Sequence, residues 1–274
     1  MNLLIATSLF LLLTDIDVTS SRARHSIGGF DKRIINGTNA ELYDFPSQVG
    51  IFYRRDNNWT LECGGVLIKP DKVLTAAHCM KGVKAINVKV SVGMLNKFGP
   101  PTQYEQIIYV KRIKIHEDFD AKAILINDLA ILTLANPAIL NNNVKVAQLA
   151  VDSSDFFDKL CIVSGWGKSN YTDISGKNRL QKTSITLLSK EECISYWKLY
   201  SDQINDRQLV CVLDKQGEPS IPCNGDSGGP LFCGPRLDQL VGVTSFGRNG
   251  CPIDSPVVYT DVSQCYRSWI ETNS

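Results

Sequence analysis

The chain has 274 residues, of which 43% are hydrophobic. From residue 34 onward it carries 25 Lys/Arg (29 less the four in residues 1–33) and 25 Asp/Glu (28 less three), so the formal charge of this part is zero. A neutral chain gives no reason to expect nucleic acid or acidic membranes as partners. The length allows one large β domain or two small ones.

The first 20 residues have the layout of a secretory signal peptide. Residues 3–13 form an apolar run too short to span a bilayer, and Val18 and Ser20 supply small residues for a cleavage site. The alternative is an apolar strand of a cytosolic domain. No later stretch is apolar enough for a membrane helix, so we expect a protein that is secreted into the extracellular space.

Nine dispersed cysteines agree with export, because metal sites favour tightly paired spacings. Asn36, Asn58 and Asn170 each begin an N-x-Thr tripeptide and are candidate glycosylation sites if the chain passes through a eukaryotic secretory route. Such tripeptides also arise by chance, and the one at Asn36 is the weakest candidate.

Beyond residue 34 the sequence predicts many short strands rich in β-branched and aromatic residues, punctuated by Gly, Pro, Asn and Asp. The predicted strands are 49–53, 65–68, 88–92, 106–115, 130–134, 161–164, 182–187, 208–212, 231–233, 240–245 and 257–260. Helical periodicity is convincing only in 263–271, where Tyr266, Trp269 and Ile270 share a face. Residues 136–150 have few strand signals and are predicted to link two halves of an all-β barrel or sandwich.

The segment Gly225-Asp-Ser-Gly-Gly-Pro230 is the strongest chemical signal. A serine hydroxyl is a poor nucleophile unless a base removes its proton, and flanking glycines let backbone N–H groups converge on one point. A glycine-rich turn is the alternative, but it does not explain so specific a hexamer.

A base and a carboxylate are available. Of three histidines, His25 lies before residue 34, and His116 lies in a polar turn and is expected at the surface. His78 stands among small residues in Leu74-Thr-Ala-Ala-His-Cys79. Asp128 comes directly before an apolar strand, where a charged side chain is unusual unless it has a function. Alone, each is explained by a core histidine or a strand cap; together with Ser227 they predict a Ser–His–Asp triad.

These motifs, with Arg33-Ile-Ile-Asn-Gly37, Asn127-Asp-Leu-Ala130 and Ser164-Gly-Trp-Gly167, resemble the trypsin/chymotrypsin family of serine peptidases from residue 34 to the C-terminus. The resemblance implies an all-β fold of two packed six-stranded antiparallel β-barrels, about 34–145 and 146–262, with a short C-terminal helix. Residues 1–20 would be the signal peptide, 21–33 an activation propeptide and 34–274 the peptidase domain.

The resemblance also implies roles for individual residues. Ser227 would be the nucleophile, His78 the base and Asp128 its orienting carboxylate, with an oxyanion hole from the N–H groups of Gly225 and Ser227. Ser245 would support the aspartate and, with Phe246, contact the substrate. Cleavage after Arg33 would free an ammonium on Ile34 that pairs with Asp226.

Disulfides by resemblance are Cys63–Cys79, Cys161–Cys233, Cys193–Cys211 and Cys223–Cys251. Cys265 is left unpaired and is expected to be buried, an intermolecular link being the alternative.

The specificity pocket departs from the trypsin pattern. Ile221 stands where trypsin-like members carry an aspartate at the pocket base, and Val257 replaces a family glycine, while Gly247 keeps the entrance open. A cationic side chain would find no counter-charge, so we expect cleavage after small or medium apolar residues. Met94 stands where calcium-binding relatives carry a glutamate, so no calcium requirement is expected. No cofactor and no metal are expected.

The expected partners are protein or peptide substrates, an activating protease and protein inhibitors, and the expected state is a monomer. The basic run Lys111, Arg112 and Lys114 alternates with apolar residues, which favours the solvated face of a strand over an exosite. The competing interpretation of the whole chain is a non-catalytic homologue that binds partners through the same fold.

Overall fold

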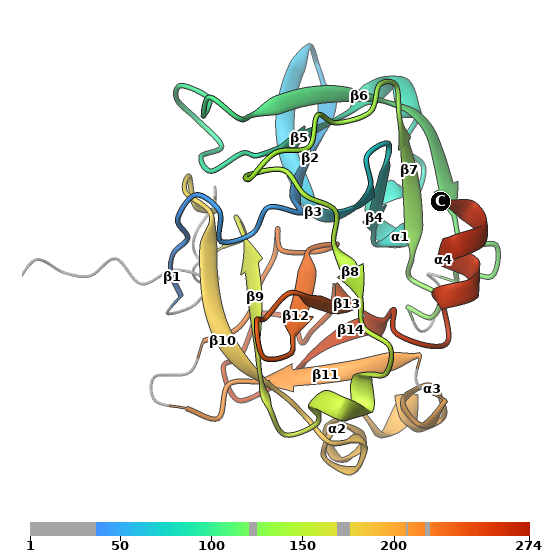
Figure 1. Cartoon of the computed structure of the whole chain (residues 1–274). Helices are drawn as coiled ribbons and strands as arrows, with labels where there is room; N and C mark the ends of the chain where they lie inside the picture. The colour runs from blue at the N-terminus through green and yellow to red at the C-terminus, as the bar shows by residue number, and fades with distance from the viewer. Residues whose placement is uncertain (1–36, 121–124, 169–175, 207, 217–219) are drawn as a thin grey trace, which may run out of the picture. The chain divides into compact units, whose positions relative to one another are not determined.

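A computed structural model (Figure 1) describes residues 37–120, 125–168, 176–206, 208–216 and 220–274. Arg33, Ile34, Asn36 and Asn170, which carry predictions made above, lie outside the described residues.

The first six long strands close into an antiparallel barrel, in the order β2-β3-β4-β7-β6-β5. These strands are β2 Gln48–Arg55, β3 Asn58–Lys69, β4 Lys72–Thr75, β5 Val88–Val92, β6 Gln106–Ile115 and β7 Ala130–Leu134. A two-residue hairpin turn at Asp56 and Asn57, both with positive φ, joins β2 to β3 and suits the strand twist. Along β2, Val49 and Ile51 alternate inward and are fully buried, as a barrel interior requires.

The second barrel has the order β9-β10-β11-β14-β13-β12, and β12 pairs back to β9. Its strands are β9 Leu160–Gly165, β10 Gln181–Leu187, β11 Leu209–Leu213, β12 Pro230–Cys233, β13 Gln239–Phe246 and β14 Val257–Asp261. Two short strands extend this sheet: β1 Thr38–Asn39 pairs with β10, and β8 Gln148–Leu149 pairs in parallel with β13. The predicted fold of two six-stranded antiparallel barrels is therefore confirmed.

Helices are short in the described residues. They are α1 Ala77–Met80, α2 Lys190–Tyr196, α3 Ser201–Asn205 and α4 Arg267–Asn273, with 3₁₀ turns η1 Ala85–Asn87, η2 Ser153–Phe156 and η3 Lys198–Tyr200. The C-terminal helix α4 follows the second barrel, yet Tyr266 and Ile270 pack into the core of the first, beside β7 in Figure 1. No helix in the described part of the chain is long and apolar enough to cross a membrane.

The barrels meet along the loop that carries Ser227. Gly64 N–H on β3 donates to the Ser227 carbonyl at 2.8 Å, and Ser164 Oγ on β9 donates to Gln48 Oε1 on β2 at 2.7 Å. Phe232 and Val243 of the second barrel join the apolar core of the first. The junction therefore fixes the Ser227 loop against both barrels.

Four disulfides have the pairs implied by the resemblance: Cys63–Cys79, Cys161–Cys233, Cys193–Cys211 and Cys223–Cys251. Cys265 is free, but it is exposed, so the expectation that it is buried is wrong. Cys265 lies in the turn that precedes α4, where the side chain of the neighbouring Tyr266 is buried in the core and that of Cys265 is exposed.

Candidate active site

Asp128 is a buried carboxylate whose two oxygens are both held. It lies just before β7 and has no exposed surface. Oδ1 accepts the His78 backbone N–H at 2.8 Å, while Oδ2 lies 2.7 Å from His78 Nδ1 and accepts from Ser245 Oγ at 2.5 Å. A buried charge requires such partners, and here three groups converge on one side chain.

His78 lies on α1 with its ring fixed by this carboxylate. A carboxylate only accepts hydrogen bonds, so Nδ1 carries the proton and Nε2 presents a free lone pair. Small neighbours allow the close approach, since Ala76 and Ala77 are fully buried beside the half-buried imidazole. The ring can therefore accept a proton at Nε2.

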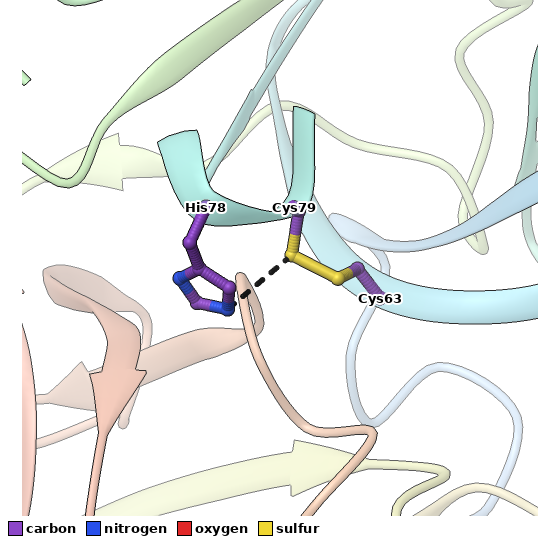
Figure 2. A group of neighbouring side chains, drawn as sticks. All are labelled: Cys63, His78 and Cys79. Atoms are coloured by element: carbon purple, nitrogen blue, oxygen red, sulfur yellow. Dashed lines mark hydrogen bonds between the residues drawn. A yellow bond between two sulfur atoms is a disulfide. The ribbon is translucent and has the colours of Figure 1, made fainter. Parts of the chain in front are cut away.

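A disulfide lies beside the same ring nitrogen. Figure 2 shows His78 next to the Cys63–Cys79 bond, with Nε2 3.8 Å from Cys79 Sγ. The ligand atoms of these three residues lie within 4.8 Å of one another, as metal ligands would. Both sulfurs belong to a disulfide, however, and therefore cannot act as thiolate ligands.

Ser227 lies in a loop that requires glycine two residues before it and directly after it. Gly225 and Gly228 have φ of +100° and +77°, and a Cβ at Gly228 would lie 2.2 Å from Thr75 Oγ1. In the described chain, neither the N–H of Gly225 nor that of Ser227 donates a hydrogen bond to protein. The two N–H groups are thus available to an anionic oxygen.

Ser227 Oγ makes no hydrogen bond to His78 Nε2 among the described residues. Such bonds are often long without substrate and tighten in the reacting complex. In the structure, the hydrogen bond between Asp128 and His78 of the predicted triad is therefore formed, and Ser227 lies beside the pocket described below.

Asp226, next to Ser227, is a second buried carboxylate, only 3% exposed. It accepts N–H bonds from Gly167 at 2.8 Å and Cys223 at 2.9 Å. Burial raises its pKa to about 6, although those two N–H bonds act in the opposite direction. Gly167 has to be glycine, because a Cβ there would lie 2.5 Å from the carboxylate.

This raised pKa makes the stability of the uncleaved chain depend on pH. The folded pKa of about 6 lies above the unfolded value near 3.9, so the folded state binds the proton more tightly. The contribution is fully present below pH 4 and is lost as the pH rises through 6, roughly 3 kcal/mol in all. Urea unfolding from pH 4 to 7 should show this fall in the free energy of unfolding.

Asp226→Asn is the matched control, because it cannot titrate. The NH₂ group of its amide faces one of the two N–H donors, which lowers stability at every pH. The two proteins are therefore compared by the slope of the free energy of unfolding against pH and not by its absolute value. Asp261, also buried with a raised pKa, adds the same slope to both proteins. Equal slopes in the two proteins would contradict the assignment.

A cavity of about 490 Å³ opens beside Ser227. Ile221 and Val257 line it and are only 1% and 5% exposed, and a Cβ at Gly247 would lie 3.5 Å from Val257 Cγ2. Arg248 is the one charged residue among the described lining. No acidic side chain lines this described cavity, so a cationic group would enter it without a counter-charge.

Phe246 belongs to an aromatic cluster at the edge of this cavity. Its ring lies 5.4 Å from Trp197 and 4.8 Å from Tyr200, and the Arg248 guanidinium lies 5.7 Å from the Trp197 ring. Neither Trp197 nor Tyr200 was predicted from the sequence to lie near the site. Their aromatic spacing in a polar stretch is the only signal that could have indicated them.

His116 is not the surface residue that the sequence predicts. Its half-buried ring stacks on Trp269 at 4.8 Å and lies edge-on to Tyr266 at 5.6 Å, and burial lowers its pKa. Tyr266 Oη in turn donates to Asn127 Oδ1 at 2.9 Å, and Asn127 has φ +56°. This contact was not predicted from the sequence: the residue that precedes α4 binds the side chain of Asn127, directly before Asp128.

Of the glycosylation candidates, only Asn58 lies in the described chain, where it is exposed at the start of β3.

Comparison with known proteins agrees with this geometry. Residues 34–270 match the Trypsin family model. Fibrinolytic enzyme isozyme C of Lumbricus rubellus is 36% identical over 247 residues, 88% of this chain and 100% of the relative. A trypsin of Sarcophaga bullata is 33% identical over 244 residues (88% and 89%), and kallikrein-2 of Homo sapiens is 32% identical over 249 residues (87% and 88%).

Three findings lead to one assignment. A family model covers most of the chain, relatives match along their full length, and a buried Asp–His pair lies with a serine in a glycine-rich loop. The chain belongs to the trypsin family of serine endopeptidases.

Proposed function

We propose that Ser227 is the nucleophile of this peptidase, with His78 as general base and then acid. The observation that carries the proposal is the Asp128 carboxylate, which binds His78 twice and Ser245 once. This network fixes the imidazole with Nε2 free to take the proton of Ser227. The acyl-enzyme would then be hydrolysed by water.

The oxyanion would bind to the N–H groups of Gly225 and Ser227. Both groups are free of protein acceptors in the described structure, and the positive φ of Gly225 supports this orientation. One such donor contributes about 3–4 kcal/mol to the stability of the transition state.

The peptidase would be secreted as a precursor, with residues 1–20 as signal peptide and 21–33 as propeptide. Cleavage after Arg33 would free the Ile34 ammonium to pair with Asp226. Support comes from the buried Asp226 carboxylate, whose pKa is raised by burial, and which accepts two N–H bonds but forms no ion pair with any described residue. An ammonium placed there would neutralise the charge.

Its preference would be for small or medium apolar residues before the scissile bond. Ile221 and Val257 support this preference because they fill the pocket with apolar surface. Ser245, Phe246 and Gly247 would pair with the backbone of the substrate. Each methylene that fits the pocket contributes about 1–3 kcal/mol to discrimination between substrates, so the preference should be graded.

The test uses protein cleaved after Arg33, with the Ile34 terminus verified and Ser227→Ala as control. Peptides that differ only before the scissile bond, with Ala, Val, Leu, Phe or Arg, are compared by kcat/KM. We expect turnover after Leu, Val or Ala and at least about 10²-fold less after Arg, because the pocket offers no counter-charge.

Three outcomes contradict the proposal. A preference for Arg would show that Ile221 does not line the base of the pocket. No turnover of any peptide would favour the non-catalytic homologue. Activity that survives in Ser227→Ala would assign the nucleophile elsewhere.

A further inference from the structure

A second cavity borders the catalytic imidazole on the side away from the specificity pocket. It has a volume of about 540 Å³ and is lined by His78 and Cys79 together with residues of the β2–β3 hairpin and of the loop after α1. It shares no lining residue with the cavity that holds Ser227 and Ile221.

The chemistry of the reaction decides what this cavity receives. The acyl part of the substrate stays on Ser227 and its side chain occupies the first pocket, whereas His78 Nε2 delivers its proton to the departing amine. The residues that follow the scissile bond therefore leave past His78. The second cavity borders the same imidazole.

The described lining of this cavity is strongly basic. Arg54, Arg55, Lys81 and Lys84 line it without any acidic residue, although residues 34–274 have a formal charge of zero. Arg55 pairs with Glu62 at 3.3 Å, and Arg54 donates to Asn87 Oδ1 at 3.0 Å. Lys81 and Lys84 are exposed and form no ion pair with any described residue.

A neighbouring groove is also lined by positively charged side chains. It has a volume of about 410 Å³, begins at Gly225 of the proposed oxyanion hole and is lined by Lys97 and Lys168. Its one described acidic residue, Glu62, is the partner of Arg55. Lysines thus line both the cavity beside His78 and the groove beside Gly225, whereas Arg248 is the one charged residue among the described lining of the first pocket.

We infer that this peptidase selects substrates with acidic side chains in the first three residues after the scissile bond, through Lys81 and Lys84 beside His78. The inference rests on the proposed function of this site and adds to it a substrate class. Exposed charges act through water, so each acidic residue should raise kcat/KM by about five-fold at low ionic strength, and salt should screen the effect.

The experiment uses the chain cleaved after Arg33 and quenched peptides with Leu before the scissile bond. They carry Glu, Gln or Lys at the second residue after it. We expect a Glu/Gln ratio in kcat/KM of about five at low salt, which falls toward one as the Debye length shrinks to about 3 Å near 1 M salt. Lys should be cleaved more slowly than Gln.

The variant Lys81→Gln/Lys84→Gln should bring the ratio close to one. Its matched control is Lys111→Gln/Lys145→Gln, which removes two exposed lysines outside the cavities described here, Lys111 on the solvated face of β6. The control should keep the ratio of the parent protein. A ratio of one in the parent at low salt, or an equal loss in both variants, would overturn the inference.

Binding to Ser227→Ala separates this inference from the proposed function. That variant keeps the cavity, so fluorescence anisotropy measures its affinity for the same three peptides without turnover. Failure of the parent to cleave any peptide would refute the proposed function, while a Glu/Gln affinity ratio above about three would still support the basic subsite. Equal affinities would overturn the subsite, whatever the turnover.

Discussion

Replacing Asp128 with asparagine should lower kcat by about 10⁴-fold, the loss found in the family enzymes from which this magnitude is taken. Both carboxylate oxygens accept hydrogen bonds, Oδ1 from His78 N–H and Oδ2 from Ser245 and His78 Nδ1. An amide must turn its NH₂ toward one of these sets. If Oδ1 of the amide still accepts the His78 backbone N–H, its NH₂ group faces the imidazole, and His78 Nδ1 has to accept a hydrogen bond from it. The imidazole proton then lies on Nε2, so His78 can no longer accept the proton of Ser227.

The measurement is kcat/KM on the best apolar peptide, with ¹⁵N NMR of the imidazole to report its tautomer. Ser245→Ala is the graded control: it removes one of three bonds to the carboxylate and should cost about ten-fold. Ser227→Ala sets the floor, about 10⁶-fold below the parent. Asp128→Asn activity within ten-fold of the parent would refute the role of Asp128.

Much of this fold is predictable from local pattern. Strands β5, β6 and β7 begin and end at the predicted residues, because β-branched runs there are bounded by turn residues. Strand β4 was not predicted, since four residues of Lys72–Thr75 give too short a pattern. Helices α2 and α3 were not predicted either, as both are short and half-exposed.

Tertiary contacts explain the remaining differences. The side chain of His116 lies against Trp269 and Tyr266, which are 150 residues or more away in the sequence, so its polar neighbours gave no indication of burial. Likewise, the basic cavity joins Arg54 to Lys84 across two elements, and neither segment is a run of charge. The motifs that contain the proposed catalytic residues consist of consecutive residues and could be recognised in the sequence. Surfaces formed by residues of several elements could not.

Blocking activation should abolish activity as completely as damage to the oxyanion hole. Arg33→Gln removes the basic residue directly before Ile34, so enzymes that cut after basic residues no longer free an Ile34 ammonium to pair with Asp226. Asp226 lies between Gly225 and Ser227, whose N–H groups would bind the oxyanion. Without that pairing we expect kcat/KM at least about 10²–10³-fold below that of the cleaved parent.

Arg33→Lys is the matched control, because it keeps a basic residue and should remain cleavable and active. The pH dependence of stability supplies a second readout of the same contact. The uncleaved chain should lose free energy of unfolding between pH 4 and 6 as Asp226 ionises, since burial raises its pKa to about 6. In the cleaved chain the ammonium favours the carboxylate, so that loss should disappear.

The two readouts decide different questions. Full activity of uncleaved Arg33→Gln would refute activation by cleavage, even if the Asp226 titration is present. If the slope is the same before and after cleavage, the new terminus does not reach Asp226, and activation has to act through another contact. Both changes together would place the switch at one buried carboxylate, because the same ion pair would then set the charge of Asp226 and the loop from Gly225 to Ser227.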